Sequence, residues 1–385
     1  MLLFLWIASL GLVLFLHAFP FTFDASLATP EAWRAFWASW GWQTHYSNAI
    51  ANAALFLPLG FLGMLAAPPR NRFARALLVV AVSLATAVVA QAAQLYLPQR
   101  DATLVDTVWN MVGLAPGVLL SLVPWRIAAR RSAWIPHLRT LPLLILGCWA
   151  AYRLAPWVPT LDVQTMKDNL KPLLLEPDFS AWAIYANFAA WLAAGLLLRE
   201  ADRGGRLDLA LPLVLALTLL GQVMIVHSGG VTLPHLAGGL LAAAVWLAVL
   251  RWPGAGFAAA GVVLVLAARI AVEGLRPFTF EDEPVRPFLW LPFAGVLGGN
   301  MWLNTLVMLE KLFLYSAMTY ALWVACRSWA LTAALGGSFL FAIEWMQQYQ
   351  PGRVAEITDP LLVVMVSMLG WALTQRERRR SRESA

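Results

Sequence analysis

Gln94-Leu-Tyr-Leu-Pro-Gln-Arg100-Asp-Ala-Thr-Leu-Val-Asp106 recurs near the end of the chain as Gln347-Gln-Tyr-Gln-Pro-Gly-Arg353-Val-Ala-Glu-Ile-Thr-Asp359. In both stretches the Arg follows the Gln by six positions, and the Asp follows the Arg by six more. Upstream, Pro20-Phe-Thr-Phe-Asp24 recurs as Pro277-Phe-Thr-Phe-Glu281. Two blocks that recur in the same order indicate an internal duplication, which must be recognised before a fold is assigned.

The chain around these stretches is apolar enough to predict an integral membrane protein. Of its 385 residues, 61% are hydrophobic and only 12% are charged. The apolar residues form twelve blocks, most of them about long enough to cross a bilayer at ~1.5 Å per residue. The expected spans are 2–19, 47–67, 75–97, 103–123, 138–154, 180–198, 208–227, 231–250, 255–273, 298–325, 328–347 and 358–375. We expect the first span to be retained rather than cleaved as a signal peptide, because it has no basic n-region and no small-residue exit.

The basic residues predict how the helices are oriented. Most of the 27 Lys and Arg lie in one set of short loops and in the C-terminal tail, around 70–75, 126–139, 199–206, 251, 327 and 376–382. The other loops are longer and richer in Trp, Pro and acidic residues. The positive-inside rule places the basic loops and both termini in the cytoplasm, and the repeated motifs on the outer side. The net charge of +6 is therefore interpreted as an orientation signal, and nucleic acid is not expected as a partner.

A degenerate third copy is expected between the two clear ones. The correspondences are Thr160-Leu161-Asp162 with Thr22-Phe23-Asp24, Asn187 with Asn52, and Thr232-Leu-Pro-His235 with Thr103-Leu-Val-Asp106. We therefore predict an all-α membrane protein of about twelve transmembrane helices in three repeated four-helix units. These first, middle and third copies cover 1–132, 133–252 and 253–385, and the third ends in a basic cytoplasmic tail. The middle copy lacks the Arg, and His235 replaces the Asp.

Polar residues on three helices of the first copy would meet hydrocarbon unless they faced one another. Asp106, Asn110, Gly113 and Gly117 form a single stripe at helical spacing, a pattern that helix packing in lipid uses. The residues expected to form an outward polar pocket are Asn52, Gln91, Gln94, Arg100, Asp106 and Asn110, with Asn48 one turn before Asn52.

Arg100 and Asp106 leave two interpretations open, because charges at this depth are costly and are usually paired or functional. They could form a structural ion pair that joins the third and fourth helices. Alternatively, Arg100 faces an anionic headgroup or phosphate while Asp106 orients its planar fork of donors.

The third copy offers a comparable set of Lys311, Glu344, Gln347, Arg353 and Asp359. Glu310 and Lys311 lie side by side in an apolar helix, so they point in different directions and each needs a partner from another helix. We expect Lys311 to pair with Glu344 or Asp359. In the middle copy His235 and Gln222 are isolated, and a lone membrane His is more commonly a hydrogen-bonded helix contact than a ligand.

The first outer loop predicts a short helix that begins at Thr29-Pro30-Glu31. Trp33, Phe36, Trp37 and Trp40 follow at helical spacing. Such an aromatic stripe suits the membrane interface. The helix could grip lipid or simply cap the bundle.

Enzyme signatures are missing from the sequence: it has no HExxH, no Gly-x-Ser-x-Gly, no P-loop and no Cys/His zinc spacing. Its two cysteines, Cys148 and Cys326, lie in apolar segments, so neither a disulfide framework nor a metal site is expected. No cofactor is expected either. Whether the chain is an enzyme stays open; if it is, Asp106, Glu344 and Asp359 are the candidate acids or bases.

The pattern Asn52-x-x-x-Phe56-x-Pro58-x-Gly60, followed by Gln91-x-x-Gln94, Arg100, Asp106, Asn110 and Gly113, resembles that of the VanZ-like family of bacterial membrane proteins. Glu344-Trp-Met-Gln347 and Glu310-Lys311-Leu-Phe-Leu-Tyr315 in the third copy are similar to other segments of that family. The tandem copies depart from its single four- or five-helix unit. The resemblance implies a multi-pass protein of the bacterial cytoplasmic membrane. Because the founding member is linked to teicoplanin resistance, it also implies an effect on envelope composition or glycopeptide susceptibility.

Three functions follow as hypotheses. The polar pockets could bind an anionic lipid or a lipid-linked envelope precursor, the chain could be an intramembrane enzyme acting on a lipid-linked substrate, or it could be a secondary transporter. Repeats are common in transporters, but these repeats run parallel and lack paired broken helices. The sequence identifies neither the ligand nor the oligomeric state.

Overall fold

A computed structural model describes residues 2–19, 21–41, 46–68, 71–98, 100–122, 138–202, 204–226, 229–297 and 301–383. Within these ranges the chain is helical, and its only β-type contacts are isolated bridges. The helices group into two compact bundles. The N-terminal bundle comprises 1–132 with 294–305, and the C-terminal bundle comprises 133–293 with 306–385.

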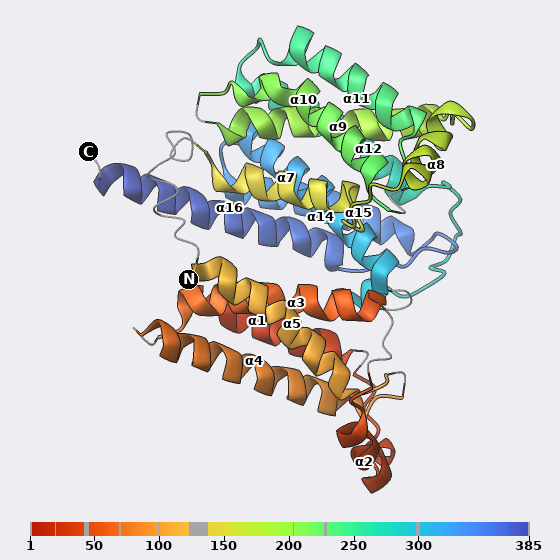
Figure 1. Ribbon diagram of the computed structural model, residues 1–385. Coiled ribbons are helices and arrows are strands. Elements are labelled where there is room, and N and C mark those ends of the chain that lie inside the picture. Colours follow the sequence, from red (N-terminus) through yellow and green to blue (C-terminus); the bar gives the residue numbers. More distant parts are fainter. Residues whose placement is uncertain are drawn as a thin grey trace. The chain divides into compact units, whose positions relative to one another are not determined.

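The N-terminal bundle consists of four long helices that lie side by side, with a short helix at one end (Figure 1). The long helices are α1 (Leu2–Ala18), α3 (Tyr46–Ala66), α4 (Arg72–Gln94) and α5 (Leu104–Leu122). Glycines allow α3 and α5 to approach closely, because a Cβ at Gly113 would lie 1.9 Å from the Ala53 carbonyl oxygen and one at Gly117 would lie 2.1 Å from that of Leu57. The small residues predicted on this stripe therefore form a helix-packing surface.

The short helix α2 (Pro30–Ala38) begins as its sequence predicts, with Pro30 in the first turn and the Thr29 hydroxyl accepting from the Ala32 N–H at 3.2 Å. Its Phe36 side chain is buried against the bundle. Trp37 and Trp40 are 55% and 60% exposed, so the aromatic stripe is divided between the bundle and the surroundings.

The C-terminal bundle is larger and has one continuous apolar core. Its principal helices are α7 (Thr140–Arg153), α9 (Ala181–Ala201), α10 (Leu211–Met224), α11 (Leu233–Val245), α12 (Ala255–Leu275), α14 (Met301–Cys326), α15 (Trp329–Gln347) and α16 (Thr358–Glu383). The core joins the expected middle and third copies: Trp149 packs edge-on against Trp191 with ring centroids 4.5 Å apart, and it also contacts Phe313. The shorter helix α8 (Val163–Leu174) also belongs to this bundle, and the π-helical segment η4 (Trp246–Leu250) continues α11, whereas α13 (Ala294–Leu297) belongs to the N-terminal bundle.

Seven helical segments in the described part of the chain are long and apolar enough to cross a membrane. They are Arg72–Gln94, Leu104–Leu122, Ala181–Ala201, Leu207–Met224, Leu233–Leu250, Ala255–Leu275 and Trp329–Gln347. Helices also occupy the other expected spans, but some are short: α1 has 17 residues and α7 has 14. The described chain is thus a multi-helix structure with seven candidate membrane spans, while the arrangement of twelve spans in three copies stays a prediction.

Equivalent backbone contacts follow α1, α7 and α12. Just beyond each helix a residue with φ near +60° (Phe21, Trp157 or Phe278) donates its N–H back to the helix end. Three residues later, the N–H groups of Asp24, Thr160 and Glu281 donate to the carbonyls of Tyr96, Met224 and Tyr349. The position of Asp24 is therefore taken by Thr160, and the expected match of Asp24 with Asp162 is wrong by two residues. Asp162 instead caps α8 by accepting from the Thr165 N–H at 2.8 Å.

Candidate functional site

The two repeated arginines lie against the C-terminal ends of helices. Arg353 Nη2 donates to the Glu273 and Arg276 carbonyls, both at 2.8 Å, at the end of α12. Arg100 Nε donates more weakly to the Phe19 carbonyl, at 3.5 Å, just beyond α1. These carbonyls have no partner within their own helix and carry the negative end of its dipole, so a cation stabilises them.

The glutamines of the repeated motif extend this cap in the third copy. Gln347 Nε2 donates to the Gly274 carbonyl at 3.0 Å, and Gln350 Nε2 donates to the Leu275 carbonyl at 2.6 Å. Together with Arg353 they satisfy the four consecutive carbonyls 273–276. In the first copy Leu97 stands at the position of Gln350, so this cap is less complete. Capping is a role that sequence reasoning did not assign to these residues.

A pocket of about 400 Å³ lies beneath α2 in the N-terminal bundle, and we call it the Arg100 pocket. It is lined by Leu27, Ala32, Ala35, Phe36, Ser39, Gln94, Leu95, Leu97, Pro98, Arg100, Asp101 and Ala102. Within the described ranges, no carboxylate lies within ion-pair distance of Arg100. The interpretation of Arg100 and Asp106 as a structural ion pair is therefore wrong. Partial burial lowers the pKa of the Arg100 guanidinium, because the charged form loses solvation.

The other predicted residues of the first copy form a separate buried cluster between α3, α4 and α5. Asn52 and Thr103 are polar neighbours of Asp106, and Gln91 Oε1 accepts from the Thr103 N–H at 3.4 Å. Asn110 is fully buried, and neither its oxygen nor its nitrogen has a partner among the described residues. The structure thus divides the predicted site: Gln94 and Arg100 line the pocket, whereas Asn52, Gln91 and Asp106 lie in the helix interface. The Asn48 side chain lies outside the described part.

Lys311 and Asp359 form the ion pair that the sequence predicted as one of two options. Lys311 Nζ lies 3.0 and 2.9 Å from the two oxygens of Asp359, and the Tyr315 hydroxyl donates to Asp359 Oδ2 at 2.5 Å. The Glu344 carboxyl is a neighbour of Asp359 and accepts from the Glu356 N–H at 2.9 Å. Two carboxyl groups therefore lie beside one ammonium group.

These groups line a cavity of about 380 Å³ in the C-terminal bundle, which we call the Lys311 cavity. Its lining includes Glu273, Glu310, Lys311, Tyr315, Glu344, Gln347, Arg353 and Asp359. All the candidate site residues of the third copy therefore meet in one place.

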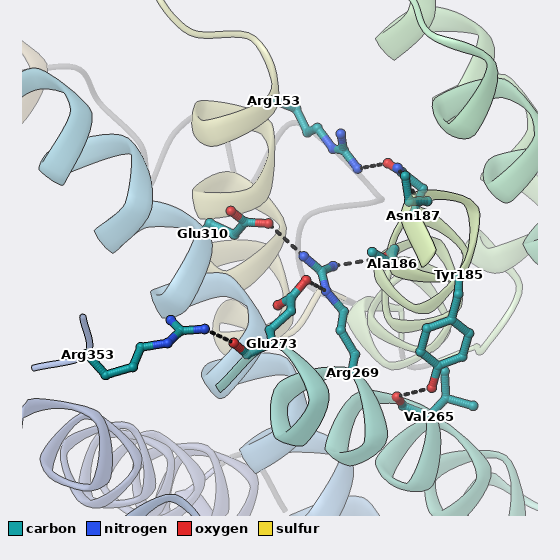
Figure 2. Close-up of polar contacts among 10 residues, drawn as sticks. Arg153, Tyr185, Ala186, Asn187, Val265, Arg269, Glu273, Glu310 and Arg353 are labelled. Carbon is teal, nitrogen blue, oxygen red and sulfur yellow. Dashed lines mark hydrogen bonds and ion pairs between the residues drawn. The ribbon is translucent and has the colours of Figure 1, made fainter. Parts of the chain in front are cut away.

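Arg269 binds two carboxylates of the cavity lining, Glu273 and Glu310, and it was not predicted (Figure 2). Its Nε lies 3.0 Å from Glu273 Oε1, its Nη2 lies 2.6 Å from Glu310 Oε1, and its Nη1 donates to the Ala186 carbonyl at 2.9 Å. The side chain is 6% exposed. The signal was available in the sequence, since Arg269 and Glu273 are four residues apart in an apolar helix.

His235 in the middle copy is not isolated. Arg153 Nη1 donates to His235 Nε2 at 2.6 Å, and Arg153 Nη2 donates to Asn187 Oδ1 (Figure 2). The middle copy thus has an arginine beside the residue that replaces the Asp, but it comes from the first helix of that copy. Gln222 is also buried and partnered. The prediction that this His is a hydrogen-bonded helix contact is confirmed.

The model of the VanZ/LLP1 family matches residues 2–125. Over this segment, about a third of its length, the chain is similar to the VanZ/LLP1 family. The VanZ-like segment contains α1 to α5 and therefore the whole Arg100 pocket. No curated protein and no solved structure matches the chain. Because the match covers only the N-terminal part, the tandem VanZ-like copies stay a prediction.

The chemistry available at the two sites differs. The Arg100 pocket has one arginine and one aspartate, Asp101, in a mostly apolar lining, whereas the Lys311 cavity is lined by several cations and several carboxyl groups. Within the ranges that the structure describes, no three His, Cys, Asp or Glu side chains lie close enough to hold a metal ion.

Proposed function

We propose that this VanZ-like membrane protein binds an anionic lipid headgroup, or the phosphate of a lipid-linked envelope precursor, in the Arg100 pocket. The main support is that the half-buried guanidinium of Arg100 has no carboxylate partner among the described residues. The protein would lie in the bacterial cytoplasmic membrane with both termini inside and this pocket toward the outer side. Through that binding it would affect envelope composition or glycopeptide susceptibility.

Electrostatics supports an anionic ligand. A charge removed from water without a counter-ion costs free energy, and a bound phosphate offsets that cost. Arg100 uses only Nε for the Phe19 carbonyl in the described structure, which leaves the two terminal nitrogens as a fork for phosphate oxygens.

The apolar part of the lining supports a lipid rather than a soluble anion. Leu27, Phe36 and Leu97 line the same pocket as the guanidinium. At and just beyond the end of α2, Trp37 and Trp40 are exposed, as expected for rings at the membrane interface. An amphipathic ligand would satisfy both parts of this lining.

We further infer that the three copies are tandem VanZ-like units. The equivalent contacts after α1, α7 and α12 support this, as do Arg100 and Arg353, which bind carbonyls at matching positions.

The first test replaces Arg100 by Ala in the full-length protein and measures retained phosphatidylglycerol by native mass spectrometry. We expect a loss of at least tenfold in affinity, about 1.4 kcal/mol, because the phosphate loses its charge partner. The matched control is Arg34→Ala, which removes an arginine of α2 that is 79% exposed and does not line the pocket. Its lipid binding should equal that of the wild type.

A second variant separates binding from the helix cap that Arg100 also provides. Ala35→Trp fills the pocket and leaves Arg100 in place, so it should also displace the lipid while thermal unfolding confirms the fold. Wild-type retention in both Arg100→Ala and Ala35→Trp would overturn the proposal.

The Lys311 cavity favours a second candidate function, acid–base chemistry on a lipid-linked substrate. The specific observation is that the Glu344 and Asp359 carboxyl groups lie in one cavity with Lys311 and Tyr315, both of which hydrogen-bond to Asp359. Purified protein would then change the mass of envelope lipids, and Glu344→Gln would stop that turnover. Unchanged lipid masses with the wild-type protein would exclude this function.

A further inference from the structure

We propose that the Lys311 cavity is a binding site for a zwitterion in which a phosphate is joined to a primary ammonium group. This site is separate from the Arg100 pocket, since all its lining residues belong to the C-terminal bundle. Its volume of about 380 Å³ lies in the range of small-molecule sites, ~300–1,000 Å³.

The cavity brings charges of both signs together. The acidic groups are Glu273, Glu310, Glu344 and Asp359, and the basic groups are Arg269, Lys311 and Arg353. These four acidic and three basic groups are close to balance. A net charge brought into such a buried place costs free energy. A ligand that is itself neutral overall, with both signs of charge, therefore suits the cavity better than a simple anion or cation.

The cavity offers hydrogen-bond donors for a phosphate. Lys311 Nζ contacts only Asp359 among the described carboxylates, and its side chain is 33% exposed. Because an ammonium has three donors, a further hydrogen bond is available. Among the described residues, Arg353 donates to the helix end through Nε and Nη2. Its Nη1 therefore remains available to a ligand.

The other wall offers acceptors for the ammonium group. Glu273 and Glu310 each accept from Arg269 through Oε1, and their side chains are 36% and 30% exposed. A carboxylate has about four acceptor positions. Arg269 and, at Glu310, the Tyr152 hydroxyl occupy only some of them. Both carboxylates belong to the network in Figure 2 and line the cavity with Lys311.

The test uses the full-length protein in nanodiscs of phosphatidylglycerol. One sample is titrated with phosphatidylethanolamine and a second with phosphatidylcholine. Native mass spectrometry measures the bound lipid. We expect at least tenfold tighter binding of phosphatidylethanolamine, because the trimethylated headgroup has no N–H to donate to Glu273 and Glu310. Equal affinity for the two lipids would overturn the proposal.

A matched pair of variants ties this preference to the cavity. Glu273→Gln keeps an acceptor for Arg269 but removes the charge, and it should cut phosphatidylethanolamine binding about tenfold. Glu281→Gln removes an exposed carboxylate outside the cavity and should change nothing. Val354→Trp fills the cavity without altering a charge and should also abolish binding. Unchanged binding in Glu273→Gln and Val354→Trp would contradict the assignment.

Two further arms identify the source of the ligand and separate this proposal from the first. Soluble glycerophosphoethanolamine should compete with the lipid if the headgroup alone carries recognition; competition by glycerophosphocholine at equal concentration would count against the site. Arg100→Ala should leave phosphatidylethanolamine binding unchanged, so that failure of the Arg100 pocket and failure of this cavity are distinguishable.

Discussion

At the scale of residues, the repeated motif combines two roles. Gln347, Gln350 and Arg353 satisfy the carbonyls at the end of α12, which explains why the three residues are spaced three apart. The same arginine also lines a cavity. A residue fixed by a helix end is held in a defined position, and such positioning is what a binding site needs.

The ion pair of Lys311 and Asp359 gives a prediction at this scale. Asp359 is 4% exposed, so Asp359→Leu leaves Lys311 without its partner and should destabilise the protein by about 3 kcal/mol. Lys311→Met in the same chain should recover much of that loss, because an apolar pair avoids desolvation. Thermal unfolding in detergent measures both effects. A double variant less stable than Asp359→Leu would contradict this account.

At the scale of elements, the close packing of α3 and α5 depends on glycine. Gly113→Ala would place a methyl group 1.9 Å from the Ala53 carbonyl oxygen, so the helices must separate. We expect a loss of about 2 kcal/mol in unfolding free energy. The matched control is Gly11→Ala in α1, where no atom lies within 4 Å of the added methyl group. That change should be neutral or slightly stabilising through helix propensity.

The sequence predicted the elements better than it predicted their contacts. Apolar blocks located the helices, and Thr29-Pro30 located the start of α2. The Lys311–Asp359 pair was expected because each charge in an apolar helix needs a partner. The role of Arg100 was missed because its acceptor is a backbone carbonyl 81 residues away, which has no sequence signature. Arg153 was missed for a similar reason, since it reaches His235 from a helix at the other end of its copy.

At the scale of the whole molecule, the division into bundles does not follow the three expected copies. The middle and third copies share one apolar core, in which Trp149 contacts both Trp191 and Phe313. A sequence repeat reflects duplication of the chain, whereas a core is formed by whichever apolar helix faces pack together. Segments of different copies can therefore pack as one body.

The predicted orientation follows from the distribution of basic residues and can be measured on the intact protein. In a background with Cys148→Ser and Cys326→Ser, a single cysteine is introduced at Glu283 or at Ser381. Glu283 lies in the acidic loop between α12 and α13, and Ser381 lies in the basic tail, so the positive-inside rule places them on opposite sides. A membrane-impermeant maleimide should label Glu283→Cys in intact cells, and Ser381→Cys only after permeabilisation. Labelling of Ser381→Cys in intact cells would show that the topology is the inverse of the predicted one. Both proposed sites would then be expected to face the cytoplasm, because the same rule predicts that the repeated motifs lie on the side opposite the basic loops.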